Sequence, residues 1–389
     1  MKSLNIFIIK NAYLFILIII ATLMFFLVLG NKSPYFSSDS YLYKHFYYQF
    51  KGHSFDESRN KILNEINVTN FDEATKNILL NDETYSISLN LVNRRVFYPY
   101  VSFLLSNFMQ NDYNNLLIPV YFSYIGVIIM IYVLIKSNKP VLFSFGSALL
   151  FLSFYPFIYW STYFLTYTIG TFFWMFNVFA AYKYLREKCN KWLVLYIFSL
   201  ILSLTNRETS ILLLPFLMFV KIFCLFRPNL KQTKIQLNKL LFSTILIIAG
   251  FFMFIFLFKQ KNIIDAIVYN QNNFGLYNKP RSLIDVISFW FNSVIYVHQG
   301  ILNDLLKHKY WGTILLLTLL NIFFRKIKKI DQLEIILISS AFASYCGLLI
   351  YPILSYRYFF PIVASLSYFY WDLISFYLNK LTIFIKKNN

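Results

Sequence analysis

Composition places this chain in a membrane. Its 389 residues are 58% hydrophobic and only 14% charged, with a mean hydropathy of +0.55, whereas soluble domains are about a quarter charged. A soluble globular protein is thereby excluded. Apolar runs recur along the whole length, so we predict one integral-membrane domain over residues 1–389 with the lipid bilayer as its surroundings.

The apolar runs predict an all-α, polytopic fold with about 10 transmembrane helices. A helix that crosses about 30 Å of hydrocarbon needs about 20 apolar residues. The first run is too long for a signal-peptide core and has no small-residue cleavage site after it, so we expect a retained span. The expected spans are residues 7–29, 116–135, 141–160, 162–182, 192–205, 209–226, 240–258, 310–324, 333–352 and 357–378.

Lysine and arginine set the orientation of these spans, because cytoplasmic loops carry the excess of basic residues. With the N-terminus inside, 20 of the 36 basic residues fall on the cytoplasmic side, together with only four acidic residues. Both termini are therefore predicted to be cytoplasmic. This topology explains most of the formal net charge of +19, so no nucleic-acid partner is expected.

One further apolar stretch, 283–302, is not counted as a span. An eleventh crossing there would move the basic sequence RKIKK at 325–329 to the outside. We instead expect an amphipathic or re-entrant helix at the outer interface. It belongs to a second extracytoplasmic segment over residues 259–309.

The first extracytoplasmic loop, residues 30–115, is the longest hydrophilic part of the chain and holds nine of the seventeen acidic residues. Its section 55–90 is expected to form one or two short amphipathic helices whose acids face solvent. Asp39, in the sequence SSDSYLY, differs because Tyr43 and Phe46 follow at +4 and +7 on the same helical face. Asp39 is either a helix N-cap or a functional carboxylate.

Arginines recur at the outer ends of the predicted spans. In each case the alternative is structural, either snorkelling at the interface or, for Arg207 and Glu208, a local pair. The functional reading is a phosphate site, because guanidinium offers a bidentate fork to phosphate oxygens. The segments are NRRVFYPYVSFLLS at 93–106 with Arg94 and Arg95, TNRETS at 205–210 with Arg207 and Glu208, and SYRYFFP at 355–361 with Arg357.

Other common sites find no support in the residues. The four histidines lack metal-ligand spacing, and the three cysteines match neither a metal site nor a disulfide framework. There is no phosphate-binding glycine loop, no Gly-x-Ser-x-Gly and no Gly-x-Gly-x-x-Gly.

Four short motifs, in order and on one side of the membrane, resemble the GT-C class of integral-membrane glycosyltransferases, which includes the dolichyl-phosphate-mannose mannosyltransferases and their bacterial relatives. The motifs are SSDSYLY after the first span, RRVFYPYVSFLLS at the end of the first loop, TNRETSILLLP, and YRYFFP before a late span. The chain departs from the class in two ways. Many relatives have an acid near the position of Tyr167, and some have paired acids where Asp39 stands alone.

The resemblance implies an enzyme that moves a sugar from a polyprenyl-phosphate donor to a glycan, lipid or protein acceptor at the outer face of a bacterial plasma membrane. It implies Asp39 as the catalytic base and Arg94, Arg95, Arg207 and Arg357 as ligands of the donor phosphate, supported by Glu208, Tyr43 and Tyr358. No cofactor is expected, and the departures from the class argue against a divalent metal.

Two other functions remain open. A polysaccharide polymerase or ligase also handles polyprenyl-linked glycans, but its large outer loop usually lies in the second half of the chain. A non-enzymatic transporter of lipid-linked glycans should show internal repeats and polar residues at mid-membrane. Here the polar residues cluster at the outer ends of the spans.

Overall fold

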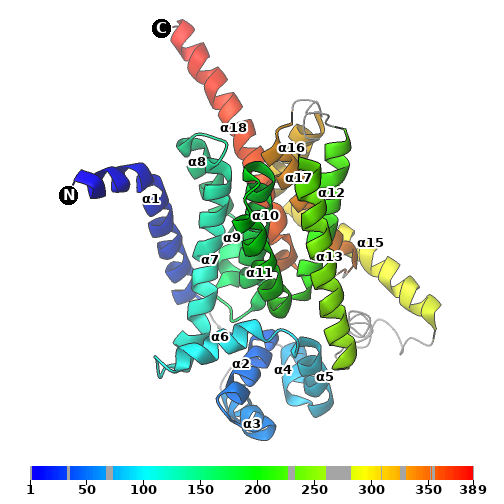
Figure 1. The fold of residues 1–389 in the computed structure, drawn as a ribbon. Coiled ribbons are helices and arrows are strands. Elements are labelled where there is room, and N and C mark those ends of the chain that lie inside the picture. Colours follow the sequence, from blue (N-terminus) through cyan, green and yellow to red (C-terminus); the bar gives the residue numbers. More distant parts are fainter. Residues whose placement is uncertain are drawn as a thin grey trace.

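The computed structural model describes residues 2–32, 36–66, 73–226, 233–259, 282–307, 309–324, 330–350, 352 and 355–388. Within these residues the regular elements are helices, with no strand, which confirms the predicted helical fold class. Long helices form a bundle, and a layer of short helices covers one of its ends (Figure 1). We call this layer, α2 to α6, the end layer.

The bundle contains helices of very different lengths, several of which are interrupted near the end layer. Its elements are α1 (Lys2–Gly30), α7 (Asp112–Lys136), α8 (Val141–Leu152), α9 (Tyr155–Ser161), α10 (Thr166–Glu187), α11 (Asn190–Asn206), η1 (Glu208–Leu212), α12 (Leu213–Leu225), α13 (Lys234–Leu257), α15 (Leu283–Lys307), α16 (Lys309–Phe324), α17 (Gln332–Ile350), η4 (Tyr356–Phe359) and α18 (Phe360–Asn388).

Six stretches of described helix are long and apolar enough to cross a membrane, or seven if one bent pair counts as a single span. The chain is thus a helical protein with several candidate membrane spans. The six are Asn11–Gly30, Asp112–Lys136, Glu208–Leu225, Lys234–Leu257, Gln332–Ile350 and Arg357–Lys380. The expected spans 162–182, 192–205 and 310–324 correspond to α10, α11 and α16, which are helical but shorter or more polar than these six.

The expected span 141–160 is not one straight helix. α8 and α9 meet at an angle of 66° across a short break at residues 153–154. Pro156 lies in the first turn of α9, where its fixed φ suits a helix start and its missing N–H costs no hydrogen bond. The segment after the bend leads into the sequence that precedes α10.

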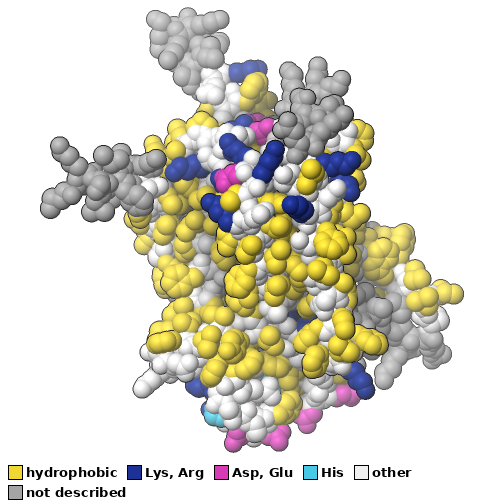
Figure 2. Space-filling view, in the orientation of Figure 1, with side chains coloured by type: hydrophobic (Ala, Val, Ile, Leu, Met, Phe, Trp, Pro, Cys, Tyr) yellow, Lys and Arg dark blue, Asp and Glu magenta, His cyan; other side chains and the backbone are white. Residues whose placement is uncertain are grey.

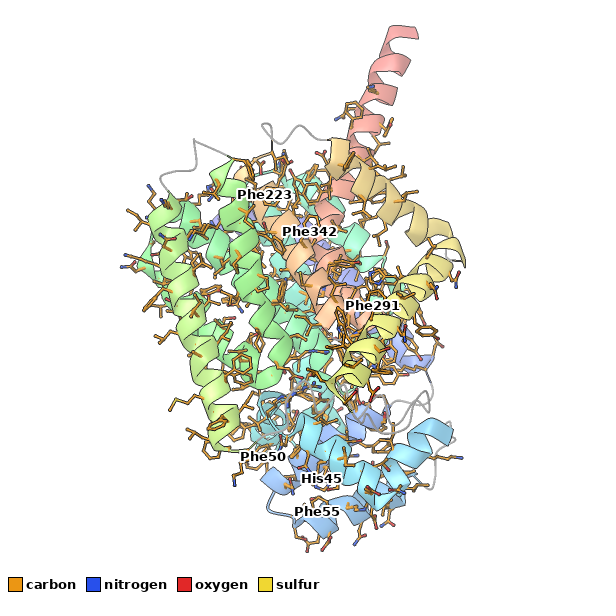
Figure 3. The ribbon with its side chains drawn as sticks, turned by 90° about the vertical axis from the view of Figure 1, so that its right-hand side faces the viewer. His45, Phe50, Phe55, Phe223, Phe291 and Phe342 are labelled. Carbon is orange, nitrogen blue, oxygen red and sulfur yellow. The ribbon has the colours of Figure 1, made fainter. Side chains whose placement is uncertain are left out.

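The end layer consists of α2 (Ser38–Phe50), α3 (Phe55–Ile66), α4 (Glu73–Leu80), α5 (Asp82–Val92) and α6 (Phe97–Ser106). Aromatic residues hold it together. Tyr41, Tyr43 and Tyr47 of α2 are fully buried. The ring centroids of His45 and Phe55, both labelled in Figure 3, lie 4.9 Å apart. The amphipathic section expected over 55–90 therefore contains three helices.

Charge is distributed unevenly between the two ends of the molecule. Basic side chains gather at the end opposite the end layer, a belt of hydrophobic side chains follows, and acidic side chains face outward from the end layer (Figure 2). Both chain termini point away from the end layer (Figure 1).

The stretch 283–302 lies within one unbroken helix, α15. The indole N–H of Trp290 in this helix donates to the carbonyl oxygen of Leu349, at 2.7 Å. α15 runs obliquely to the other long helices, at the edge of the bundle (Figure 1). Residues 260–281 and 308 of the segment expected over 259–309 lie outside the described residues.

Candidate functional site

Five interrupted segments meet where the bundle contacts the end layer. They are the start of α2, the link between α5 and α6, the start of α10, the turn between α11 and η1, and η4 before α18. Helix ends leave backbone groups and side chains that are not used in regular packing. The breaks therefore gather polar side chains at one place, at one end of the apolar bundle.

Asp39 lies in the first turn of α2 but does not cap it. The N-cap is Ser37, whose hydroxyl accepts the backbone N–H of Ser40, while the Ser40 hydroxyl accepts the N–H of Ser37. The N-cap interpretation of Asp39 is therefore wrong, because Ser37 completes a capping box two residues earlier. The Asp39 carboxylate instead contacts Arg357, Nη1 to Oδ2, at 3.3 Å, with 34% of its side chain exposed.

Arg357 and Arg207 share one aromatic partner, Tyr167. The guanidinium carbon of Arg207 lies 3.5 Å from the centroid of the Tyr167 ring, and that of Arg357 lies 4.4 Å from it. Arg357 also lies 4.6 Å from the centroid of Trp160, and Arg207 lies 5.2 Å from that of Tyr358. The negative face of an aromatic ring attracts cations at such distances, so the rings hold both arginines in place.

Arg207 is placed by the break between α11 and η1. α11 ends at Asn206, Arg207 is extended at φ −163° and ψ 126°, and η1 begins at Glu208. The side chain is 5% exposed, and its Nη1 has no hydrogen-bond partner among the described residues. An unpaired buried guanidinium nitrogen is costly, so Arg207 is suited to an incoming anion.

Both arginines line a cavity of about 50 Å³. That volume holds more than one water, since one water needs about 10–15 Å³ on this measure. The walls combine cations, aromatic rings, small hydroxyl side chains and two glycines. They are formed by Tyr167, Gly170, Thr171, Trp174, Arg207, Thr209, Ser210, Leu212, Ser344, Gly347, Arg357, Tyr358 and Pro361. Its chemistry suits a small anionic group with hydroxyl substituents.

Arg94 and Arg95 do not line this cavity; both contact Glu208. Nη2 of Arg94 lies 3.1 Å from Oε1 of Glu208, and Nε of Arg95 lies 2.9 Å from its Oε2. We call this group of three the Glu208 clamp. It replaces the local pair expected between Arg207 and Glu208, because Glu208 is turned toward the link between α5 and α6 instead.

The clamp extends to the end layer through a tyrosine. Arg95 donates to the Tyr43 hydroxyl at 3.1 Å, and that hydroxyl lies 3.0 Å from Oγ1 of Thr166 at the start of α10. Burial alone would lower the pKa of Arg95, but the Glu208 carboxylate raises it well above its ordinary value. Burial raises the pKa of Tyr43, opposed by the charge of Arg95. Both side chains therefore keep their protons at neutral pH.

Lys32 is a buried lysine near the same region that the sequence did not single out. It is 6% exposed, and its side-chain nitrogen donates to Oγ1 of Thr162 at 2.7 Å. The nitrogen lies 5.0 Å from the centroid of Tyr159. Burial lowers the pKa of Lys32 to about 6. Trp160 and Tyr167 were also not proposed as site residues, although they stand within the aromatic sequence YWSTYFLTYTIG at 159–170.

The structure thus separates the predicted residues into two groups. Arg207, Arg357 and Tyr358 line the cavity, and Asp39 is joined to it through Arg357. Arg94, Arg95, Glu208 and Tyr43 form the clamp and its extension. Within the described residues, no three His, Cys, Asp or Glu side chains are grouped so that they could hold a metal ion. The buried ring of His45 accepts or donates a hydrogen bond at Tyr85, 2.8 Å away, in the end layer.

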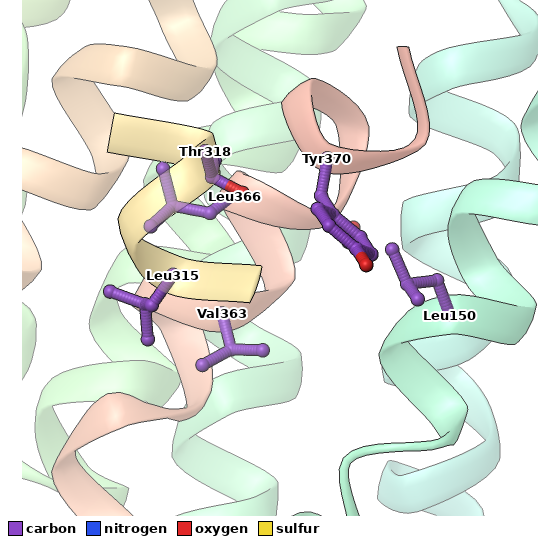
Figure 4. A pocket seen from close by; sticks show the side chains of 7 residues that line it. Leu150, Leu315, Thr318, Val363, Leu366 and Tyr370 are labelled. Carbon is purple, nitrogen blue, oxygen red and sulfur yellow. The ribbon is translucent and has the colours of Figure 1, made fainter. Parts of the chain in front are cut away.

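A second cavity, of about 20 Å³, lies among α8, α16 and α18 (Figure 4). Its lining differs from that of the first cavity. Its lining is largely aliphatic, with Leu150, Leu315, Val363 and Leu366. No charged residue lines it, so it offers neither an acid nor an anion site.

Comparison with known proteins identifies no relative. No protein-family model, no curated protein and no solved structure matches the chain. The function must therefore be argued from the site alone.

Proposed function

We propose that the protein is a membrane glycosyltransferase that moves a sugar from a polyprenyl-phosphate donor to a glycan, glycolipid or protein acceptor. One observation carries the proposal. A half-exposed carboxylate, Asp39, contacts Arg357 beside a cavity where Arg357 and the unpaired Arg207 face the same space. A carboxylate next to a cationic pocket provides both a proton acceptor and a site for a phosphate leaving group.

The finer topology is part of this proposal. With α10, α11 and α16 as additional crossings and both termini cytoplasmic, the chain would have about ten spans. The basic surface opposite the end layer supports this orientation (Figure 2). The end layer and the cavity would then lie at the extracytoplasmic headgroup level of a bacterial plasma membrane, where a polyprenyl-phosphate head is found.

In the proposed reaction the acceptor hydroxyl attacks the anomeric carbon of the donor sugar. Asp39 takes the hydroxyl proton as the new carbon–oxygen bond forms, a role worth about 10²–10⁴-fold. The bond between the anomeric carbon and the phosphate oxygen breaks, and both of its electrons leave with the polyprenyl phosphate. Arg207 and Arg357 stabilise the charge that grows on this phosphate, without reorganisation because both are already held by Tyr167. Direct displacement inverts the anomeric centre.

Arg94 and Arg95 take a different role from the one that their sequence suggested. Their charges are balanced in part by Glu208, so we assign them to fixing the turn that carries Arg207. Tyr43 extends this contact to α10, and Tyr358 completes the cavity wall beside Arg207.

The test is the product released from a panel of lipid-linked sugars by the purified protein in nanodiscs. The proposal predicts acceptor-dependent release of polyprenyl monophosphate. Release of polyprenyl diphosphate instead would indicate a polymerase or ligase. Movement of intact lipid-linked glycan between leaflets without bond cleavage would indicate a transporter, and either result would reject the proposal.

A further inference from the structure

Tyr167 is the residue on which the two arginines of the cavity converge. It is the second residue of α10 and only 7% exposed. Asp39 and Arg95 also act electrostatically on it. Tyr167 therefore interacts with the acid and with three of the four arginines discussed above.

Two guanidinium groups that lie over the same ring repel each other. Arg357 is partly balanced by Asp39, whereas Arg207 has no carboxylate among the described ion pairs. The ring of Tyr167 is the nearest group that attracts both cations. The ring attracts the cations without taking their hydrogen bonds. Nη1 of Arg207 has no partner among the described residues, whereas Arg357 donates through Nε to Ser355 Oγ at 3.0 Å and through Nη1 to Asp39.

We propose that Tyr167 is a positioning residue that holds Arg207 and Arg357 together so that both bind one phosphate group in the cavity. The ligand class is a phosphate monoester or diester, either on a lipid head or free in solution. The inference deepens the proposed function and rests on it for the identity of the donor. It does not require sugar transfer, because it concerns anion binding alone.

The aromatic ring of Tyr167, rather than its hydroxyl, would hold the two arginines together. The Tyr167 hydroxyl lies 3.5 Å from that of Tyr358, at the outer limit for a hydrogen bond and well beyond the ordinary 2.7–2.8 Å for two oxygens. Gly170, one turn along α10, packs beside Arg207, and a Cβ there would lie at an ordinary contact distance of 3.4 Å from its Cδ. Removal of the hydroxyl should therefore matter little, and removal of the ring should matter greatly.

The experiment compares Tyr167→Phe with Tyr167→Leu in nanodiscs of phosphatidylcholine. The probe is a polyprenyl monophosphate at increasing mole fraction, with inorganic phosphate as a second arm. Tryptophan fluorescence reports binding, since Trp174 lines the cavity and Trp160 lies against Arg357. We expect Tyr167→Phe to bind within about twofold of wild type and Tyr167→Leu to bind roughly tenfold more weakly, as the loss of cation–π contacts implies.

A double variant separates positioning from a general structural role. If Tyr167 acts through Arg207, then Tyr167→Leu should weaken binding much less when Arg207→Gln is already present. Additive losses would overturn the inference, and so would a loss in Tyr167→Phe equal to that in Tyr167→Leu. Should Tyr167→Leu fail to fold, Tyr167→Met removes the ring with a similar side-chain volume.

The two probes and a transfer assay distinguish the possible failures. Saturable binding of inorganic phosphate alone assigns the site to a free anion, and binding of the lipid alone assigns it to a headgroup. Binding of the lipid without any sugar transfer would reject the proposed function but leave the role of Tyr167 standing. If wild type binds neither probe, the inference itself is wrong.

Discussion

The Glu208 clamp and the cavity each contain two arginines at the same end of the bundle. The two groups differ in the partners that stabilise the arginine charges. In the clamp, the carboxylate of Glu208 contacts both Arg94 and Arg95. In the cavity, Arg207 and Arg357 share the ring of Tyr167, and only Arg357 also has a carboxylate, that of Asp39, among the described ion pairs.

The difference suggests how arginines for structure can be told from arginines for binding. A carboxylate compensates a guanidinium charge and occupies its donors. An aromatic ring stabilises the cation without compensating its charge, and Nη1 of Arg207 keeps no hydrogen-bond partner among the described residues. All four residues are arginines at or beside breaks between helices, so the distinction appears only in the partners.

The largest effect is expected in the clamp, from Glu208→Gln. This change leaves two guanidiniums that are buried against the bundle without their anion. Loss of one partner of a buried ion pair costs about 3–5 kcal/mol, so we expect a large fall in thermal stability in detergent. Glu57→Gln, on an acid that is 63% exposed, is the matched control and should leave the stability unchanged. Equal stability of the two variants would show that the clamp is not structural.

Asp39→Asn tests the acid beside the cavity. The amide keeps the shape but cannot take the acceptor proton, so we expect sugar transfer to fall by about 10²–10⁴-fold. The loss of thermal stability should be smaller than in Glu208→Gln, because the Asp39 side chain is 34% exposed and contacts one arginine instead of two. Asp112→Asn is the control, because Asp112 also lies at the start of a helix and forms an ion pair with a basic side chain, that of Lys51, at 2.8 Å. Full transfer activity in Asp39→Asn would exclude Asp39 as the base.

Arg207→Gln should lower transfer by about 10²–10³-fold, as loss of one preorganised donor to a developing oxyanion does. Thermal stability should hold or rise, because a buried guanidinium with an unpartnered nitrogen is removed. The transfer activity of Arg207→Lys should lie between those of wild type and Arg207→Gln, since lysine keeps the charge but loses the planar fork. A variant that loses stability in proportion to activity would place Arg207 with the structural arginines.

The smallest effects are expected from two glycines of the cavity wall. A Cβ at Gly347 would lie 2.8 Å from Cδ1 of Leu212, which must then move within the wall, whereas a Cβ at Gly170 meets Arg207 at an ordinary distance of 3.4 Å. We expect Gly347→Ala to cost about 1 kcal/mol and to weaken phosphate binding a few-fold. Gly170→Ala should change both by less. The opposite order in a paired binding and melting experiment would show that the cavity wall is not packed as described.

The helical membrane fold could be predicted from the sequence, because apolar runs of the length of α7 or α13 have few other stable states. The break between α8 and α9 lies inside the expected span 141–160, because hydropathy stays high across it. Pro156 is compatible with a new helix start at this point, but hydropathy alone does not register that signal.

From the sequence, the candidate site could be described only as polar residues at span ends that are predicted to share one side of a membrane. Two of these residues, Asp39 and Arg357, lie 318 positions apart in the chain and are in contact. The sequence did not predict which side chains would pair. Glu208 contacts Arg94 and Arg95, 114 and 113 positions away, instead of its neighbour Arg207. Tyr167 also received no weight, because one tyrosine among 31 carries no distinct signal before the arginines are placed.

The most direct test is a structure of the protein in nanodiscs with a polyprenyl monophosphate. The account predicts that the phosphate lies in the cavity, with its oxygens at about 3 Å from Nη1 of Arg207 and from the guanidinium of Arg357, and with Asp39 facing the remaining space. A phosphate bound instead at Arg94 and Arg95, with Glu208 displaced and the cavity empty, would contradict the assignment of the two arginine groups.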